Sequence, residues 1–316
     1  MHRPAVSVLI NNHNYGGLVA DAIASALCQE EVAAEIIVVD DGSTDQSRSV
    51  LESCRDRVRI VFQDNRGQAA AINAGVEASR GEFLCFLDAD DWWAPGKLRA
   101  VVAAFQSNPD TVLVYHRLQP LLADGSLTLK PIPRTLCDGD ISRRLARSAG
   151  WWPFPMTSAI AVKRSAWEAV GAIPSQFRIS ADAWLAGIYP FIGHVAALPA
   201  SLGFYRIHSN NWYRSADDAA MLLRRMAHWR ATVEASNRFL DAHGLAASLS
   251  LDDHFPYRVA AAKLRGADFR NRLNLAFEGL FFAGEPNFFR RTRDALRAVR
   301  DIPPAGLGAR LSGVAK

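Results

Sequence analysis

A short acidic segment follows a very apolar stretch in the first half of the chain. Asp88, Asp90 and Asp91 come directly after Phe83-Leu84-Cys85-Phe86-Leu87. Such a run is typical of a buried strand, so the acidic residues lie where that strand ends. Carboxylates are ligands that Mg²⁺ or Mn²⁺ accepts together with substrate phosphate oxygens. The segment predicts a cation bound to a diphosphate, although the same aspartates could instead cap the helix expected at Pro95.

The elements that must position this segment alternate between strand and helix. Short β-branched runs predict strands at 6–10, 35–39, 59–62, 83–87 and 112–115. Helical patterns lie between them, near 17–28, 45–54, 68–79 and 95–107. Strict alternation predicts an α/β fold with a mostly parallel sheet flanked by helices, and ligands collect at the carboxyl ends of its strands. Polar clusters sit at these ends, at 11–14, 40–43, 64–67 and 88–91.

The rest of the chain divides into an irregular part and a helical part. Residues 116–157 are rich in proline, and from Ser158 a strand, two helices and a further strand ending near Tyr205 complete the sheet. Beyond about Asn211, apolar residues recur at three- and four-residue spacing, which predicts helices alone. We therefore expect three parts, at 1–115, 116–211 and 212–316.

The composition is that of a globular protein. With 316 residues, 49% hydrophobic and 22% charged, the chain can bury a full core. Its four cysteines form no C-x-x-C pair, which fits reduced, buried thiols. We find no signal-peptide pattern and no membrane-spanning run, and so expect a cytoplasmic location. The net charge of +4 is modest, and we expect no nucleic acid partner.

Basic residues gather at the end of the chain. Residues 286–316 carry seven of them against Asp294 and Asp301. This tail could give a peripheral contact with the inner face of the cell membrane, form a homodimer contact, or be only a solvated helix face.

Four motifs in a fixed order cover about a third of the chain. They are Val6 to Asn14, V-V-D-D-G-S-T-D at 38–45, N-R-G through N-A-G at 65–75, and G-E-F-L-C-F-L-D-A-D-D at 81–91. Together they resemble glycosyltransferase family 2. The resemblance implies a Rossmann-like GT-A fold with a C-terminal helical extension. It also implies inverting transfer of a sugar from a nucleotide-diphosphate sugar with Mn²⁺ or Mg²⁺.

The resemblance also implies a nucleotide-sugar site in residues 1–115. Asn11 and Asn14 line the nucleotide, Asp41 accepts a hydrogen bond from the base, and Asp88 and Asp90 lie at the donor, with Asp90 on the metal. An ionised carboxylate only accepts hydrogen bonds, so Asp41 suits the N–H of uracil and the donor is expected to be a UDP-sugar. Asp40 could instead brace the turn. Arg66 could meet a phosphate at a helix N-terminus, or face solvent.

The resemblance places the acceptor site and a catalytic base at 116–211. Ser180-Ala181-Asp182-Ala183-Trp184-Leu185 resembles the segment that opens with the base, so Asp182 is the expected base, with Ala181 where the family usually has glutamate. Asp182 could also simply favour the first turn of its own helix. Tyr205-Arg206-Ile207-His208 resembles a closing motif whose histidine approaches the diphosphate or its metal, which makes His208 a metal-site candidate.

Two adjacent tryptophans, Trp151 and Trp152, are candidates for an acceptor platform, because aromatic faces pack on sugar rings. They could equally be core residues. The expected acceptor is a hydroxyl of a saccharide or lipid-linked molecule in polysaccharide or glycoconjugate assembly. Two other functions stay open from the sequence: a sugar-phosphate nucleotidyltransferase, and a non-catalytic subunit that binds a nucleotide sugar.

Overall fold

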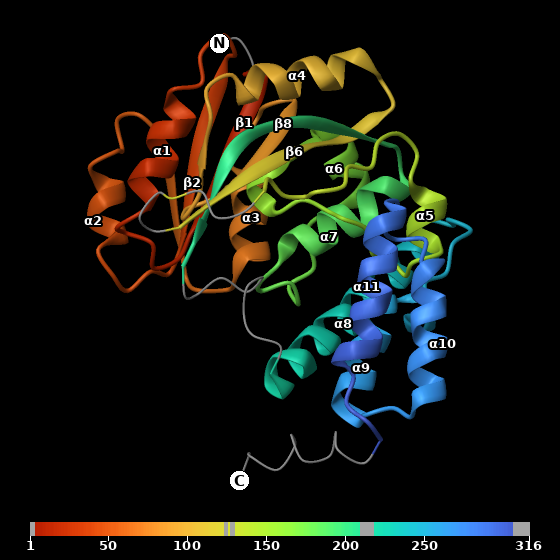
Figure 1. The fold of residues 1–316 in the computed structure, drawn as a ribbon. Helices are drawn as coiled ribbons and strands as arrows, with labels where there is room; N and C mark the ends of the chain where they lie inside the picture. The colour runs from red at the N-terminus through yellow and green to blue at the C-terminus, as the bar shows by residue number, and fades with distance from the viewer. Residues whose placement is uncertain (1–3, 123–125, 127–129, 209–217, 306–316) are drawn as a thin grey trace. The chain divides into compact units, whose positions relative to one another are not determined.

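The structure is a computed structural model that describes residues 4–122, 126, 130–208 and 218–305 (Figure 1). The chain forms two compact units. The first comprises Met1–Ile141 and Phe154–Ser209, and the second comprises Ser142–Pro153 and Asn210–Lys316. The expected boundary at 211/212 lies outside the described residues. Residues 142–153, which we expected within the sheet-forming part, belong to the helical unit.

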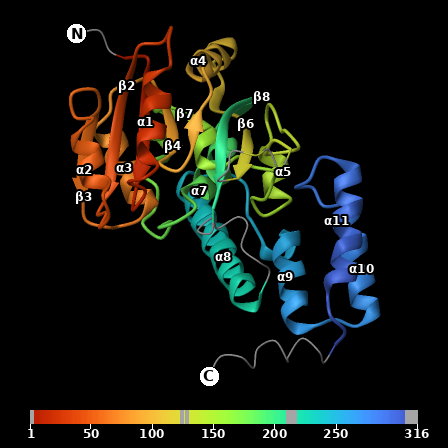
Figure 2. The same ribbon diagram turned by 60° about the vertical axis from the view of Figure 1, so that its left-hand side comes forward.

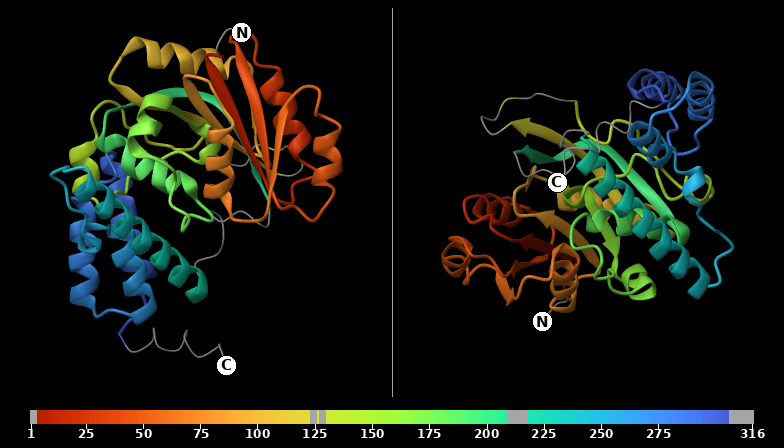
Figure 3. Two further views of the ribbon diagram at one scale, coloured as in Figure 1. Left: turned by 180° about the vertical axis from the view of Figure 1, so that it is seen from behind. Right: turned by 90° about the horizontal axis from the view of Figure 1, so that it is seen from below.

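An eight-stranded sheet forms the centre of the first unit (Figures 1 and 3). Its strand order is β3-β2-β1-β4-β7-β6-β8-β5. Strands β3, β2, β1 and β4 are parallel, and the pairs β4–β7, β7–β6 and β8–β5 are antiparallel. The strands are β1 (Val6–Asn12), β2 (Ala34–Asp41), β3 (Arg59–Gln63), β4 (Phe83–Asp88), β5 (Trp92–Trp93), β6 (Thr111–Leu122), β7 (Ile160–Lys163) and β8 (His194–Ile207).

Helices cover both faces of this sheet. Alternate residues of β1, such as Val8 and Ile10, pack with α1 (Val19–Leu27), α2 (Ser47–Glu52) and α4 (Lys97–Ser107). On the opposite face, α3 (Gln68–Glu77) lies over Leu9, and Phe86 meets Trp167 of α6 (Arg164–Val170). The helix α7 (Ala181–Ile188) and the short 3-10 helices η1 (Thr157–Ala159) and η2 (Tyr189–Phe191) complete the unit.

The expected alternation of strands and helices is confirmed, with one addition. The strand expected from Ser158 is β7, which runs antiparallel between β4 and β6, so the sheet is mixed on that side. Trp92 and Trp93 form the two-residue strand β5, which pairs with Phe204 and Gly203 of β8. This pairing brings the segment after the acidic turn to the strand that ends beside His208.

The second unit is helical. Asp218, Asp268 and Asn287 cap α8, α10 and α11, because each side chain accepts a hydrogen bond from a backbone N–H of the first turn. Leu275 and Ala298 form part of a small apolar cluster between helices. The helices are α5 (Ser142–Ala146), α8 (Ala219–Ala242), η4 (Leu251–Asp253), α9 (Phe255–Arg265), α10 (Phe269–Leu280) and α11 (Phe288–Asp301).

Among the described helices, none has the length and apolar character needed to cross a bilayer. All four cysteines are free thiols. Cys85 and Cys137 are buried as expected, whereas Cys28 is exposed at the end of α1. The expectation of burial is therefore wrong for Cys28.

Candidate active site

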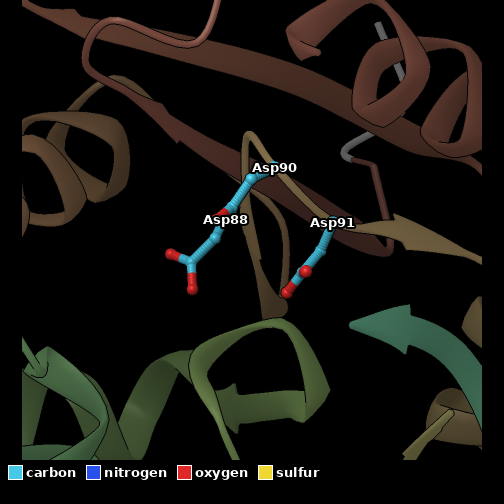
Figure 4. A group of neighbouring side chains, drawn as sticks. All are labelled: Asp88, Asp90 and Asp91. Atoms are coloured by element: carbon cyan, nitrogen blue, oxygen red, sulfur yellow. The ribbon is translucent and has the colours of Figure 1, made fainter. Parts of the chain in front are cut away.

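Three aspartates gather on the turn after β4. One ligand oxygen from each of Asp88, Asp90 and Asp91 lies within 4.8 Å of those of the other two (Figure 4). Asp88 is the last residue of β4, whose apolar residues 83–87 are all buried, and Asp90 and Asp91 are buried beyond it. The buried strand therefore ends in a compact group of carboxylates.

Asp88 is held by neutral donors and is crowded by charge. The Nδ2 of Asn11 donates to Asp88 Oδ1 over 2.9 Å, and the Nε2 of Gln68 donates to the same oxygen over 2.8 Å. Burial, followed by the negative charges of Asp90 and Asp182, raises the pKa of Asp88 to about 7. These neighbours are neutral or negative, so they do not balance the negative charge of ionised Asp88.

Asp91 faces the start of β7 and the end of β8. Its Oδ2 accepts from the Ser158 hydroxyl over 2.6 Å, and its Oδ1 accepts from the Arg206 backbone N–H over 3.0 Å. Burial, followed by the charges of Asp90 and Asp88, holds its pKa well above the usual range. Ser158 also accepts from the Asp88 backbone N–H over 3.1 Å, so one hydroxyl joins both aspartates.

His208 lies beside Asp90 of the acidic turn. Its Nε2 lies 2.8 Å from Asp90 Oδ2, and the ring of Tyr15 lies edge-on to the histidine ring at 5.6 Å between centroids. Arg206 donates through Nε to the Asp90 carbonyl over 3.1 Å, and its guanidinium lies 4.6 Å from the Trp92 ring centroid. His208, directly after β8, thus brings an imidazole to the acidic turn, and Arg206 of β8 holds that turn through a hydrogen bond.

Side-chain hydrogen bonds hold the turn after β2, and Asp40 is one of their acceptors. Asp40 accepts from Asn12 Nδ2 over 2.7 Å and from the Ser43 hydroxyl over 2.5 Å. Asn14, in the left-handed region at φ 59°, accepts from the Thr44 backbone N–H over 2.8 Å. The turns after β1 and β2 are therefore joined to each other by side chains.

The Asp41 carboxylate already accepts three hydrogen bonds from within the protein. It accepts from Gln63 Nε2 over 2.6 Å, from the Arg66 N–H over 2.9 Å and from the Gly67 N–H over 2.7 Å. A carboxylate has about four acceptor positions, so one remains for another donor. Arg66 contributes its backbone to this contact, and its side chain is exposed.

Asp182 lies in the first turn of α7 and is only 9% exposed. Burial raises its pKa to about 6. The N–H of Ala181 donates over 2.9 Å to Oε1 of Gln68, the same side chain whose Nε2 donates to Asp88. Gln68 thus connects Asp88 of the acidic turn to the backbone of the residue before the expected base.

The two tryptophans proposed for the acceptor lie in the second unit. Trp152 is 1% exposed and presents no free aromatic face in this structure. Trp151 packs on Phe282 with ring centroids 5.3 Å apart. Trp151 therefore contributes to the packing of the helical unit, and Trp152 is buried.

Sequence reasoning missed four residues of the site. Tyr15, Gln68, Ser158 and Arg206 all contact the aspartates or His208. Gln68 and Tyr15 stand beside polar turns at the ends of strands, and Arg206 lies within the motif that identified His208. Ser158 carries no comparable signal, because a serine before a strand is common.

The cluster fits a divalent cation. Its carboxylate oxygens are hard ligands close enough to share one ion. The donors described above are amides, hydroxyls and a backbone N–H, together with His208, so negative charge accumulates in a buried place. A cation would offset that charge, which adds to the effect of burial in raising the pKa values of Asp88 and Asp91.

The mixed sheet ending in an acidic turn is the architecture of GT-A glycosyltransferases, and solved structures of that class match it. TarS of S. aureus in complex with UDP-GlcNAc covers 94% of this chain and 90% of its own, with a TM-score of 0.53 and 13% identity. A mannosyltransferase from Pyrobaculum calidifontis, in complex with GDP-Man and Mn²⁺, matches with a TM-score of 0.53 and 18% identity over 99% of this chain and 79% of its own. At these identities the likeness shows the fold alone.

Sequence comparison gives the family. The model of "Glycosyl transferase family 2" matches residues 7–171. An uncharacterized glycosyltransferase of Nostoc sp. is 36% identical over 267 residues, covering 80% of this chain and 81% of its own. The succinoglycan biosynthesis protein ExoU of Rhizobium meliloti is 36% identical over 154 residues, 45% of each chain. The chain belongs to glycosyltransferase family 2 and is a glycosyltransferase rather than a nucleotidyltransferase.

Proposed function

We propose that this enzyme transfers a sugar, with inversion, from a UDP-sugar to a hydroxyl of a saccharide or lipid-linked acceptor, using Mn²⁺ or Mg²⁺. The observation that carries the proposal is that Gln68 donates to Asp88 and accepts from the backbone N–H of Ala181, the residue before Asp182. It supports an arrangement in which a cation-binding turn and a buried carboxylate of raised pKa serve one site, as transfer from a diphosphate donor requires.

The acidic turn and His208 are proposed to hold the cation and the diphosphate. Asp90 would bind the cation together with Asp88 and Asp91, and His208 lies in contact with Asp90. When bound, the cation supplies positive charge that offsets the charge developing on the leaving diphosphate. Arg206 and Ser158 hold the turn in place through the contacts described above, so the carboxylates need little rearrangement.

Asp182 is proposed to accept the proton of the acceptor hydroxyl. Because its pKa is about 6, most of the group is ionised at neutral pH and can act as a base. The hydroxyl oxygen forms a bond to the anomeric carbon as the bond to the diphosphate oxygen breaks on the opposite face. A single displacement of this kind inverts the configuration.

Buried acceptor atoms support a nucleotide site at the ends of β1 and β3. The side-chain oxygens of Asn11, Asn12 and Gln63 are buried and accept no hydrogen bond from the described residues. Buried polar atoms are normally satisfied, so a ligand that supplies N–H or O–H groups would complete them. Asp41, next to Gln63, keeps one acceptor position for the base, and Asn14 holds the turn beside it.

The proposed donor and the proposed class of acceptor are supported by what is known of similar proteins from their names. UDP-GlcNAc in TarS and GDP-Man with Mn²⁺ in the mannosyltransferase show both nucleotides on this fold. An ionised Asp41 can accept from the N3–H of uracil, and the N1–H of guanine is a donor of the same kind, so we propose UDP and include GDP-sugars in the test below. ExoU and TuaG are named for succinoglycan and teichuronic acid biosynthesis, which supports polysaccharide or glycoconjugate assembly. Trp151 and Trp152 remain a prediction for the acceptor site.

The test is a screen of nucleotide sugars for Mn²⁺-dependent hydrolysis, which needs no knowledge of the acceptor. We expect release of a nucleoside diphosphate from a UDP-sugar, and loss of this activity in Asp90→Ala. Hydrolysis of a GDP-sugar alone would overturn the choice of base. Failure to bind any nucleotide sugar, with or without divalent ions, would overturn the function itself.

A further inference from the structure

The second unit carries an exposed aromatic face on α10 and α11, which lie side by side (Figures 1 and 2). Of the ten large apolar side chains that are exposed among the described residues, seven lie here. Isolated exposed apolar residues are ordinary, but a concentration on two neighbouring helices marks a binding surface. We call this set the aromatic face: Phe269, Leu273, Phe277, Phe281, Phe288, Phe289 and Leu296.

The spacing of these residues makes a continuous stripe on α10. Phe269, Leu273 and Phe277 follow one another at intervals of four, and Phe281 continues the series just beyond the helix. Residues at this spacing share one side of a helix. The rings of Phe277 and Phe281 lie 5.1 Å apart, yet the two side chains are 64% and 68% exposed. The stripe is therefore separate from the side that Leu275 and Gly279 bury.

Helix α11 repeats the arrangement. Phe288 and Phe289 open the helix and are 58% and 81% exposed, and Leu296, two turns later, is 65% exposed. Ala295 and Ala298 are the buried residues of this helix. Small residues thus face the packing contact while the large apolar ones face outward, which is the reverse of what internal packing alone would favour.

The aromatic face is accompanied by arginine. Residues 269–301 contain seven arginines and no lysine, against Glu278, Glu285, Asp294 and Asp301. This segment therefore has a net charge of +3, and the whole chain has a net charge of +4. The guanidinium of Arg272 lies 5.9 Å from the ring centroid of Phe269, and that of Arg291 lies 5.9 Å from that of Phe288. Cationic groups therefore lie beside the exposed rings.

We propose that the aromatic face docks on the surface of an anionic lipid bilayer. The phenylalanines would enter the boundary between headgroups and acyl chains, and the arginines would meet lipid phosphates. A second copy of the chain is the other occupant to consider. A symmetric contact would bring the arginine-rich face against itself, and like charges oppose such a contact. An anionic membrane supplies the complementary charge.

Co-sedimentation of the full chain with vesicles tests this proposal. We expect binding to phosphatidylcholine vesicles that contain about one third phosphatidylglycerol, weak binding to pure phosphatidylcholine, and release as salt shortens the range of electrostatic attraction. Phe277→Ser with Phe289→Ser should lower the partition coefficient by about tenfold or more. Arg297→Gln, at an exposed position next to Leu296, should lower it by roughly fivefold.

Matched controls come from α8, where Leu223 and Arg224 are also exposed. Leu223→Ser and Arg224→Gln should bind vesicles like the unaltered chain, and thermal unfolding should show that every variant folds. Phe289→Ser alone serves if the double variant is unstable.

Three results would overturn the proposal. They are unaltered protein that stays in the supernatant with anionic vesicles, control variants that lose as much binding as the test variants, and a dimer by light scattering that the phenylalanine variants convert to monomer. The last result would assign the face to a second copy of the chain.

Discussion

The Nε2 of Gln68 lies 2.8 Å from Asp88 Oδ1, while the Oε1 of the same amide lies 2.9 Å from the backbone nitrogen of Ala181. The orientation of the amide follows from the Ala181 partner, because a backbone N–H only donates and so must face the amide oxygen. One side chain at the start of α3 therefore fixes the separation between the acidic turn and the first turn of α7.

Replacing Gln68 should affect both ends of this connection. Gln68→Ala removes both hydrogen bonds and leaves a partly buried N–H without its acceptor, so we expect unfolding free energy to fall by about 1–3 kcal/mol. Donor hydrolysis should fall by about tenfold because Asp88 and α7 lose their fixed spacing. Urea denaturation and steady-state kinetics measure the two effects. Gln106→Ala, at an exposed position on α4, is the control, and equal behaviour of the two variants would contradict the role of Gln68.

Asp182→Asn should separate turnover from donor binding. Loss of the base should lower sugar transfer by about 10²- to 10⁴-fold while the nucleotide sugar still binds. In the unaltered enzyme, activity should fall as pH drops through about 6, because Asp182 becomes protonated there. The measurement is a pH profile of turnover with binding followed by calorimetry. Asp56→Asn, an exposed substitution, should leave the profile unchanged, and an Asp182→Asn enzyme of full activity would refute the assignment.

Removal of the central carboxylate should abolish stabilisation by Mn²⁺. A ligand at 100 times its Kd stabilises the folded state by about 2.7 kcal/mol, and Mn²⁺ should raise the melting temperature accordingly. Asp90→Ala should remove this increase, whereas Glu77→Ala, on the exposed side of α3, should keep it. A chelator should return the unaltered protein to its metal-free melting temperature. An undiminished shift in Asp90→Ala would place the ion elsewhere.

Lys97 gives a stability prediction away from the site. This lysine is fully buried, its Nζ lies 3.4 Å from the ring centroid of Trp93, and burial lowers its pKa from 10.5 to about 8. A folded-state pKa below the unfolded value means that the protonated form destabilises the fold. This penalty is complete below about pH 8 and fades as pH rises toward 10.5.

Lys97→Met should therefore raise unfolding free energy at pH 7 by about 1–2 kcal/mol, less the lost contact with the ring, and by less at pH 10. Urea unfolding at the two pH values measures this difference. Lys130→Met, at an exposed position, should show no such dependence on pH. A destabilised Lys97→Met protein at pH 7 would show that the ring contact outweighs the cost of burial.

The parts of the fold that the sequence predicts are those with a local pattern. The strands and the acidic turn follow from apolar runs and the polar residues that end them, and His208 follows from a motif. Strand β7 has four residues and pairs antiparallel with β4, a contact decided by residues about 80 positions away. The placement of Trp151 depends in the same way on Phe282, which no local pattern reveals.

The neutral polar residues of the site could not be predicted from the sequence either. Ser158 and Gln68 act through hydrogen bonds to aspartates, and their residue types carry no charge that would mark them. The occupation of Asp41 by three internal donors also needed the structure, because two of those donors are backbone N–H groups.

The two-residue strand β5 ties the acidic turn to β8 through Trp92–Phe204 and Trp93–Gly203, although more than a hundred positions of sequence separate the partners. The residues between the paired segments include β6, β7 and the helix that carries Asp182. This two-residue pairing therefore joins the two ends of a long span of the chain beside the site. It sets the acidic turn next to the segment that carries His208, whose Nε2 lies 2.8 Å from Asp90 Oδ2.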